Sequence, residues 1–348
     1  MYFYDTMLEM TVISPNQTWP NCTLPYRVDK IPLILLYSLV LIIGLPANVA
    51  TVYMTFLQVR RKNVLGIYLL SLSLCDLMYL CTLPMWAVYV GKEHKWPWTS
   101  FACKLTSYIF FNNMYISIFL LCCVSVDRFV TVAYGLESRG LRQQKLAGAV
   151  TSSICLLVAL VHLPVFTMAE GETDQQQSCF EPSQPSLTVT GFNYARFVIG
   201  FLLPVAILVV TNRRIFASIQ ASETIHAKQK YKIKCLTMVV IIFFLVFFGP
   251  YHLILLLRAV TFHIPQLRYD CDFEVRVYTP YTISLGLSTV NSAMNPILYV
   301  LASDNIRKEI RHGLVALVRR SIQRHQTDSS QNKMQSSEAT QGQENPSS

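Results

Sequence analysis

The chain has 348 residues, of which 52% are hydrophobic and only 14% are charged. Soluble domains carry about a quarter charged residues, so this composition excludes an ordinary soluble protein and indicates a membrane protein. The formal net charge of +9 does not point to nucleic acid, because the basic residues cluster between apolar stretches, as on the cytoplasmic side of membrane proteins.

The first segment, residues 1–30, is polar and carries two glycosylation sequons, at Asn16 and Asn21. It lacks a basic stretch followed by an apolar one, so no cleaved signal peptide is expected. Two sequons in a short polar tail favour an N-terminus on the outer side of the membrane. We therefore expect a glycosylated extracellular tail.

Seven apolar stretches follow, each long enough to cross a bilayer as a helix, and we find no eighth. They cover residues 31–57, 65–91, 103–134, 145–168, 189–212, 233–260 and 278–301. Basic clusters follow the first, third, fifth and seventh stretches, which places those connections in the cytosol. The predicted fold class is an all-α membrane protein, with a seven-transmembrane helix bundle over residues 31–301.

A short amphipathic segment and a polar tail complete the chain. Residues 302–320 place Ile306, Ile310 and Leu314 at helical spacing between arginines. This pattern is typical of an eighth helix lying on the inner membrane surface. Residues 321–348 are rich in serine, glutamine and threonine, which predicts a disordered cytoplasmic tail.

Four cysteines fall in segments expected outside the cell: Cys22, Cys103, Cys179 and Cys271. Four free thiols are unusual in an oxidising compartment, so we expect two disulfides, for which three pairings are possible. Cys103 with Cys179 would tie the third span to the second outer loop. Cys22 with Cys271 would tie the N-terminal tail to the third outer loop.

Asp76 lies in the middle of the otherwise apolar second span. A lone carboxylate in hydrocarbon is costly, so it should face the bundle interior and a polar partner from another span. The candidate partners are Asn48, Ser117, Asn291, Ser292 and Asn295. Two interpretations stay open, a sodium or water site and a purely structural hydrogen-bonded carboxyl.

Asp127 and Arg128 end the third span, one span length after Cys103. At a helical rise of about 1.5 Å per residue, Arg128 lies roughly 37 Å from Cys103, at the cytoplasmic face. Paired with each other, the two charges need not face lipid, and an arginine released from its partner could meet an incoming protein.

Prolines interrupt six of the seven spans, the third being the exception. Each proline removes a backbone hydrogen bond and permits a kink. In the sixth span, Phe244 and Phe248 precede Pro250, a combination that suits a hinge. In the seventh, the segment from Asn295 to Tyr299 places a polar, kinked stretch near the cytosolic end.

Six motifs occur in order along the spans: GLPAN at 44–48, LSLCD at 72–76, Cys103, Asp127-Arg128-Phe129, Phe244 with Pro250, and Asn295-Pro296 through Tyr299. Together they resemble those of the class A, rhodopsin-like G-protein-coupled receptors. Segments such as YGLESRG at 134–140 and PYHL at 250–253 are similar to the proton-sensing and lysophospholipid-related branch. One member of that branch, which this chain resembles, is linked to oxidised fatty acids and lysophosphatidylcholine.

The resemblance implies a receptor in the plasma membrane, not an enzyme, that activates heterotrimeric G proteins and has arrestin and receptor kinases as further partners. It implies no cofactor or metal and no nucleic acid. It also implies the Cys22–Cys271 bridge. The switch and coupling residues that it implies are Asp127, Arg128, Phe244, Pro250, Asn295, Pro296 and Tyr299.

Several positions depart from the family pattern. Phe248 stands where a tryptophan usually precedes the sixth-span proline, and Asn212 replaces the usual fifth-span tyrosine. Asn295 occupies a site that can be aspartate, and Asp76 is the one buried carboxylate that we expect. These departures touch the expected activation switches and the acidic groups of a proton sensor.

Basic residues near the expected outer ends of the spans predict the chemical class of the ligand. Arg196 and Arg258, with Lys104 and His252, would form a basic upper pocket above an aromatic floor of Phe244, Phe248 and Tyr251, with Tyr108 nearby. Such a pocket suits an anionic amphipathic lipid, an oxidised fatty acid or a lysophospholipid. The competing interpretation for each arginine is snorkelling to the lipid headgroups.

Two alternative functions remain open. The histidines on the outer half, His94, His162, His252 and His263, could sense protons, because imidazole titrates between pH 5 and 8. Altered switch residues could also make the receptor largely constitutive. A transporter is disfavoured because no internal duplication is detectable, and an enzyme because no catalytic motif is present.

Overall fold

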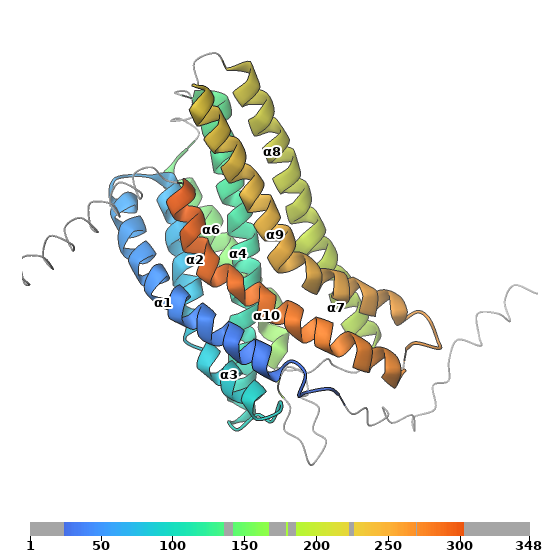
Figure 1. Ribbon diagram of the computed structural model, residues 1–348. Helices are drawn as coiled ribbons and strands as arrows, with labels where there is room; N and C mark the ends of the chain where they lie inside the picture. The colour runs from blue at the N-terminus through green and yellow to red at the C-terminus, as the bar shows by residue number, and fades with distance from the viewer. Residues whose placement is uncertain are drawn as a thin grey trace, which may run out of the picture. The chain divides into compact units, whose positions relative to one another are not determined.

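The computed structural model describes residues 24–135, 142–166, 179, 186–222, 226–268 and 270–302, and the secondary structure of these residues is helical (Figure 1). In chain order the elements are α1 (Lys30–Arg60), α2 (Val64–Leu80), α3 (Leu83–Gly91), α4 (Ser100–Tyr134), α6 (Gln144–His162), η3 (Leu163–Phe166), α7 (Leu187–Phe197), η4 (Val198–Leu202), α8 (Leu203–Ala221), α9 (Ala227–Thr261) and α10 (Cys271–Ala302). The two sequons and the segment predicted as an eighth helix lie outside the described residues, apart from residue 302.

Six helical stretches are long and apolar enough to cross a membrane. The seventh, α10, is equally long but less apolar, because the face that it turns inward carries polar side chains. The buried ones are Ser284, Ser288, Thr289, Asn291, Ser292 and Asn295. The predicted all-helical bundle is therefore confirmed, and its seventh helix is the most polar.

Prolines divide three of the predicted spans into shorter elements. The second span breaks between α2 and α3, where Pro84 occupies the first turn of α3. The fourth ends in the 3-10 turn η3, which contains Pro164. The fifth passes through η4, a π-helical turn, immediately before Pro204. Proline lacks the N–H that would continue a regular α-helix, so each break has a local cause.

The fifth and sixth helices extend further than the apolar pattern predicts. α8 continues to Ala221, past the expected limit at residue 212, and α9 begins at Ala227, before the expected start at residue 233. The added turns carry basic residues such as Arg213 and Lys230. Hydropathy detects the part of a helix inside the bilayer, so it misses these charged ends.

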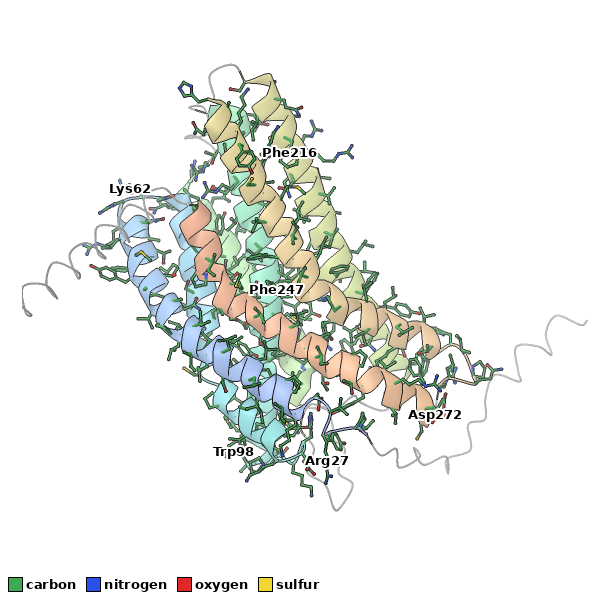
Figure 2. All side chains as sticks on the ribbon, in the orientation of Figure 1. Arg27, Lys62, Trp98, Phe216, Phe247 and Asp272 are labelled. Atoms are coloured by element: carbon green, nitrogen blue, oxygen red, sulfur yellow. A yellow bond between two sulfur atoms is a disulfide. The ribbon has the colours of Figure 1, made fainter. Side chains whose placement is uncertain are left out.

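α4 is the central helix of the described bundle, packing against α2, α6 and α8. α1 packs on α2 and α3, and α7 and α8 pack on α9 (Figure 1). Large apolar side chains project outward from the helices (Figure 2), with Ile42 71% exposed and Val161 63% exposed. Polar side chains such as Asn48 and Asp76 are fully buried instead. This reversed distribution is that of a protein whose solvent is lipid.

Candidate functional site

A disulfide fixes the N-terminal end of α4. Cys103 bonds to Cys179, with the two Cα atoms 5.8 Å apart, which confirms that predicted pair. The backbone N–H of Cys179 also donates to the Tyr89 hydroxyl at 3.2 Å. Cys271 is disulfide-bonded as well. Cys22, its predicted partner, lies outside the described residues, so that pairing stays a prediction.

Arg196 of α7 points into the bundle and not toward lipid. Its guanidinium carbon lies 4.3 Å from the centre of the Phe111 ring. The side chains of Tyr115, Tyr251 and Tyr281 lie within electrostatic range of the same guanidinium. Among the described residues no carboxylate pairs with Arg196, although four other ion pairs are present. Arg196 is thus a cation held by aromatic rings, without an anion to match it.

Two histidines complete the wall around Arg196. His162 of α6 stacks on Phe111 and Tyr115, with ring centres 5.6 and 5.1 Å away. His252 of α9 stacks on Phe201, with ring centres 5.4 Å apart. The site therefore combines residues from α4, α6, α7, η4 and α9, and Tyr281 of α10 closes it from another side.

Among the described residues, two buried polar atoms at this site have no hydrogen-bond partner, Tyr115 Oη and His252 Nε2, while the Tyr251 hydroxyl interacts with the Arg196 guanidinium. His252 Nδ1 lies 2.7 Å from the Phe248 carbonyl oxygen. Since a carbonyl only accepts, Nδ1 carries the proton and Nε2 is left as an acceptor. An unmatched buried polar group costs about 1–3 kcal/mol. Two such atoms beside an arginine that has no carboxylate partner among the described residues are typical of a site where a polar ligand completes the hydrogen bonding.

Gly200, in the π-helical turn η4, allows these side chains to meet. A Cβ at this position would overlap Cε1 of Tyr115 and lie 3.3 Å from Nε2 of His252. π-helical turns inside α-helices frequently mark functional sites. Sequence reasoning missed Gly200, Phe111, Tyr115 and the place of His162 at this site. The glycine four residues before Pro204 was the available signal.

Arg258, the second predicted ligand arginine, is already matched by a carboxylate. It forms an ion pair with Glu274 of α10, and its guanidinium carbon lies 5.2 Å from the Tyr281 ring centre. The expectation of an open anion site or of a snorkelling chain at Arg258 is therefore corrected. Because Glu274 follows sixteen residues after Arg258, on another helix, the sequence did not suggest the pair.

The other predicted ligand residues divide into two groups. Lys104 and Tyr108 donate to backbone oxygens of the fourth span, Phe166 at 3.4 Å and Ala159 at 3.1 Å. These hydrogen bonds direct both side chains toward the fourth span and not toward Arg196. Phe244 and Phe248 are each 1% exposed; their rings pack together, and Phe244 also stacks on Phe201. The expected aromatic cluster is present, but its rings pack against one another, so they do not form the floor of an open pocket.

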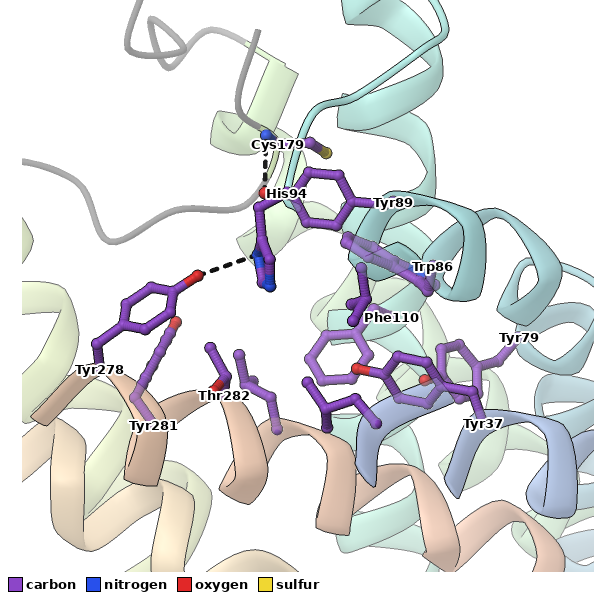
Figure 3. A pocket seen from close by; sticks show the side chains of 13 residues that line it. Tyr37, Tyr79, Trp86, Tyr89, His94, Phe110, Cys179, Tyr278, Tyr281 and Thr282 are labelled. Atoms are coloured by element: carbon purple, nitrogen blue, oxygen red, sulfur yellow. Dashed lines mark hydrogen bonds between the residues drawn. The ribbon is translucent and has the colours of Figure 1, made fainter. Parts of the chain in front are cut away.

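A separate cavity of about 50 Å³ lies near the N-terminal end of α10, between that helix and α1, α2 and α3 (Figure 3). Its wall is mostly aromatic, and Tyr281 is shared with the surroundings of Arg196. At one end the Tyr278 hydroxyl lies 3.0 Å from His94 Nδ1 (Figure 3). His94 Nε2 lies 3.8 Å from a carboxylate oxygen of Asp29, and Thr282 donates to the other oxygen at 2.6 Å.

Asp76 is buried in a polar core, as predicted. Its oxygens accept from Asn113 at 2.9 Å and from Asn295 at 2.8 Å. Ser292 donates to Asn113 at 3.2 Å, and Asn48 donates to the Ser292 carbonyl at 2.8 Å. Asn113 was missed by sequence reasoning, although an Asn-Asn pair inside an apolar span was a visible signal.

Other candidates for the polar core do not bond to Asp76. Ser117 and Asn291 are buried, as predicted, but neither forms a hydrogen bond with the Asp76 carboxylate. Three buried oxygens have no partner in this group, namely Ser117 Oγ, Asn48 Oδ1 and Asn295 Oδ1. Carboxylate, amide and hydroxyl oxygens are the ligands that hard cations prefer, so the residues fit a sodium ion or water.

Near the C-terminal end of α4, Asp127 binds an arginine that the sequence did not suggest. Arg142, two residues before α6, donates to both carboxylate oxygens, at 2.7 and 2.8 Å. Asp127 thus has a partner that the sequence did not suggest, and its pairing with Arg128 stays a prediction. The side chain of Tyr299 lies outside the described residues.

Comparison with known proteins agrees with this architecture. The family described as "7 transmembrane receptor (rhodopsin family)" matches residues 47–299. The chain is 44% identical to "Probable G-protein coupled receptor 132" of Mus musculus, over 88% of this chain and 78% of the relative. It is 45% identical to the Homo sapiens protein of that name, over 82% and 74%. It is 31% identical to "G-protein coupled receptor 68" of Homo sapiens, over 86% and 80%.

The family match covers most of the chain and all of the polar core, and the relatives are receptors and not enzymes. The chain therefore belongs to the rhodopsin family of seven-transmembrane, G-protein-coupled receptors.

Proposed function

We propose that this receptor binds an anionic amphipathic lipid from outside the cell, with its carboxylate or phosphate on Arg196. The proposal rests on the guanidinium of Arg196, which has no carboxylate partner among the described residues and lies beside two buried polar atoms without partners there, Tyr115 Oη and His252 Nε2. A carboxylate would form charge-assisted bonds to the arginine. A second oxygen in the ligand, as in a hydroxylated or oxidised chain, would bond to Tyr115, Tyr251 or His252.

The apolar tail needs space that the packed rings of Phe244 and Phe248 do not offer. The cavity beyond Tyr281 lies next to the Arg196 site and is lined mainly by apolar and aromatic groups. Its volume of about 50 Å³ holds on the order of three to five water molecules. A longer chain therefore requires Tyr281 and its neighbours to move. That ligand-dependent movement would favour one of two helix packings and so activate a G protein.

The proposal places the receptor in the plasma membrane with its N-terminus outside, and arrestin and receptor kinases among its cytosolic partners. Its test is G-protein activation in cells by an oxidised fatty acid and by a lysophospholipid. Arg196→Gln should reduce potency by about ten- to a hundredfold, the effect of losing a bond to a charged group. Arg258→Gln should have a much smaller effect, since Arg258 is paired with Glu274. Equal loss in both variants would contradict the proposal.

A second candidate function, proton sensing, is favoured by one observation at His94. Among the described residues, His94 is the one candidate histidine that lies beside a carboxylate, that of Asp29. His162 bonds to a backbone carbonyl and, like His252, lies near Arg196. A positive imidazolium is disfavoured beside that cation. His263 stacks on Tyr194.

Protonation of His94 would strengthen its attraction to Asp29 and hold residues 26–29 against α10. The groups facing His94 are Asp29, Tyr26, Tyr89 and Tyr278. We expect signalling between extracellular pH 6 and 8 to lose its pH dependence in His94→Phe and to keep it in His263→Phe. A pH response that survives in His94→Phe would exclude this second function.

A further inference from the structure

Two arginines and one carboxylate lie around Tyr281 of α10. The guanidinium carbon of Arg258 lies 5.2 Å from the centre of the Tyr281 ring, and Arg258 forms an ion pair with Glu274. Arg196 of α7 acts electrostatically on the same tyrosine. Tyr251, whose ring centre is 6.1 Å from that of Tyr281, is within range of both guanidiniums. The two arginines therefore act on one shared site.

The formal charges of this site do not cancel. Within the described part of the chain, the charged side chains that act on Tyr281 are Arg196, Arg258 and Glu274. Two positive charges and one negative charge leave a net formal charge of +1. The side chains of Arg258 and Glu274 are 12% and 13% exposed, so salt and water screen these charges only weakly.

Lipid head groups differ in the charge that such a site has to match. A carboxylate or a phosphodiester carries one negative charge, whereas a phosphate monoester carries about −1.5 to −2 near pH 7. The cost of removing an ion from water rises with the square of its charge, but its attraction to the site rises only in proportion to that charge. One net positive charge therefore compensates a monoanion better than a dianion.

We propose that Glu274 makes the receptor selective for monoanionic over dianionic lipids, because it neutralises Arg258 and leaves Arg196 to bind the ligand. This inference rests on the proposed function, since it requires an anionic group at Arg196, and it extends that function to the class of head group. Without the charge of Glu274, Arg258 is a second cation facing the same tyrosine. A phosphate monoester could then bond to both guanidiniums.

The test titrates purified full-length receptor, in nanodiscs of zwitterionic phospholipid, with an alkyl phosphate monoester and with its methyl diester. The two probes share one alkyl chain and differ by one charge. The unmodified receptor should bind the diester at least as tightly as the monoester. Glu274→Gln should shift the affinity ratio toward the monoester by about tenfold, because a repulsive charge is lost and a guanidinium is released. Glu274→Asp keeps the charge and should keep the original ratio.

Two further variants separate the charge of Glu274 from its structural role. Combining Arg258→Gln with Glu274→Gln removes both partners and leaves one net positive charge, so the affinity ratio should return to that of the unmodified receptor. Asp272→Asn removes an exposed carboxylate from the first turn of the same helix and should not change the ratio. An unchanged ratio in Glu274→Gln, a shift that persists in the double variant, or an equal shift in Asp272→Asn would overturn the inference.

Arg196→Gln distinguishes this inference from the proposed function. If neither probe binds more weakly to Arg196→Gln than to the unmodified receptor, the anionic group does not lie on Arg196 and both proposals are wrong. If both probes lose affinity in Arg196→Gln while Glu274→Gln leaves their ratio unchanged, the proposed function holds and selection by Glu274 is excluded.

Discussion

At the scale of single residues, the Arg196 site depends on Gly200, because glycine has no side chain. Gly200 leaves room for Tyr115 and His252 to approach η4 from two other helices. The ring of Tyr115 then stacks on His162 and faces His252 edge to face, at 5.1 and 5.9 Å between ring centres. A glycine without this role would tolerate a methyl group easily.

Gly200→Ala should therefore reduce lipid potency by about tenfold, because forcing an extra carbon into a packed interior costs about 1–3 kcal/mol. The measurement is G-protein activation against lipid concentration, corrected for receptor at the cell surface. Gly191→Ala, also on the fifth span, is the control, since a Cβ there meets nothing within 4 Å. If both alanine variants respond like the unmodified receptor, the close approach at Gly200 has no role in binding.

At the scale of elements, broken helices supply the polar contacts and the points of bending. α9 contains Pro250 between Phe248, which packs in the core, and His252, which faces the Arg196 site. Under the proposed function, a bend there would link movement at the ligand to the long N-terminal part of α9. Proline removes one backbone hydrogen bond, so bending at this position is less costly than elsewhere in the helix.

Pro250→Ala should lower maximal lipid-stimulated signalling severalfold while leaving lipid affinity within about threefold, because it restores the backbone bond outside the binding site. Separate measurements of lipid binding and of G-protein activation distinguish the two effects. Pro280→Ala, in the exposed outer part of α10, serves as the control. Unchanged maximal signalling in Pro250→Ala would argue against a hinge at this proline.

At the scale of the whole molecule, hydropathy and a few motifs predicted the fold and one disulfide. Span-length apolar stretches and alternating basic connections are local properties, so they can be read directly from sequence. The carboxylate at Asp76 was also predictable, since a lone charge in hydrocarbon has to turn inward. Its bond to Asn295 follows from the same reasoning.

The pairs that sequence reasoning missed depend on which helices become neighbours. Arg258 meets Glu274 across α9 and α10, and Arg142 meets Asp127 across α6 and α4. Each charge had several candidate partners in the sequence, and packing selects among them. The sequence predicted the cation of the Arg196 site but not its aromatic wall, because side chains from six elements form that wall.

The central claim is that Arg196 binds the anionic group of the ligand, and direct binding tests it without any signalling step. Purified receptor in nanodiscs would be titrated with a hydroxylated fatty acid and with its uncharged methyl ester. Our account predicts that the acid binds at least about tenfold more tightly than the ester, and that Arg196→Gln abolishes this difference. Equal affinity for acid and ester in the unmodified receptor, or a preference for the acid that persists in Arg196→Gln, would contradict it.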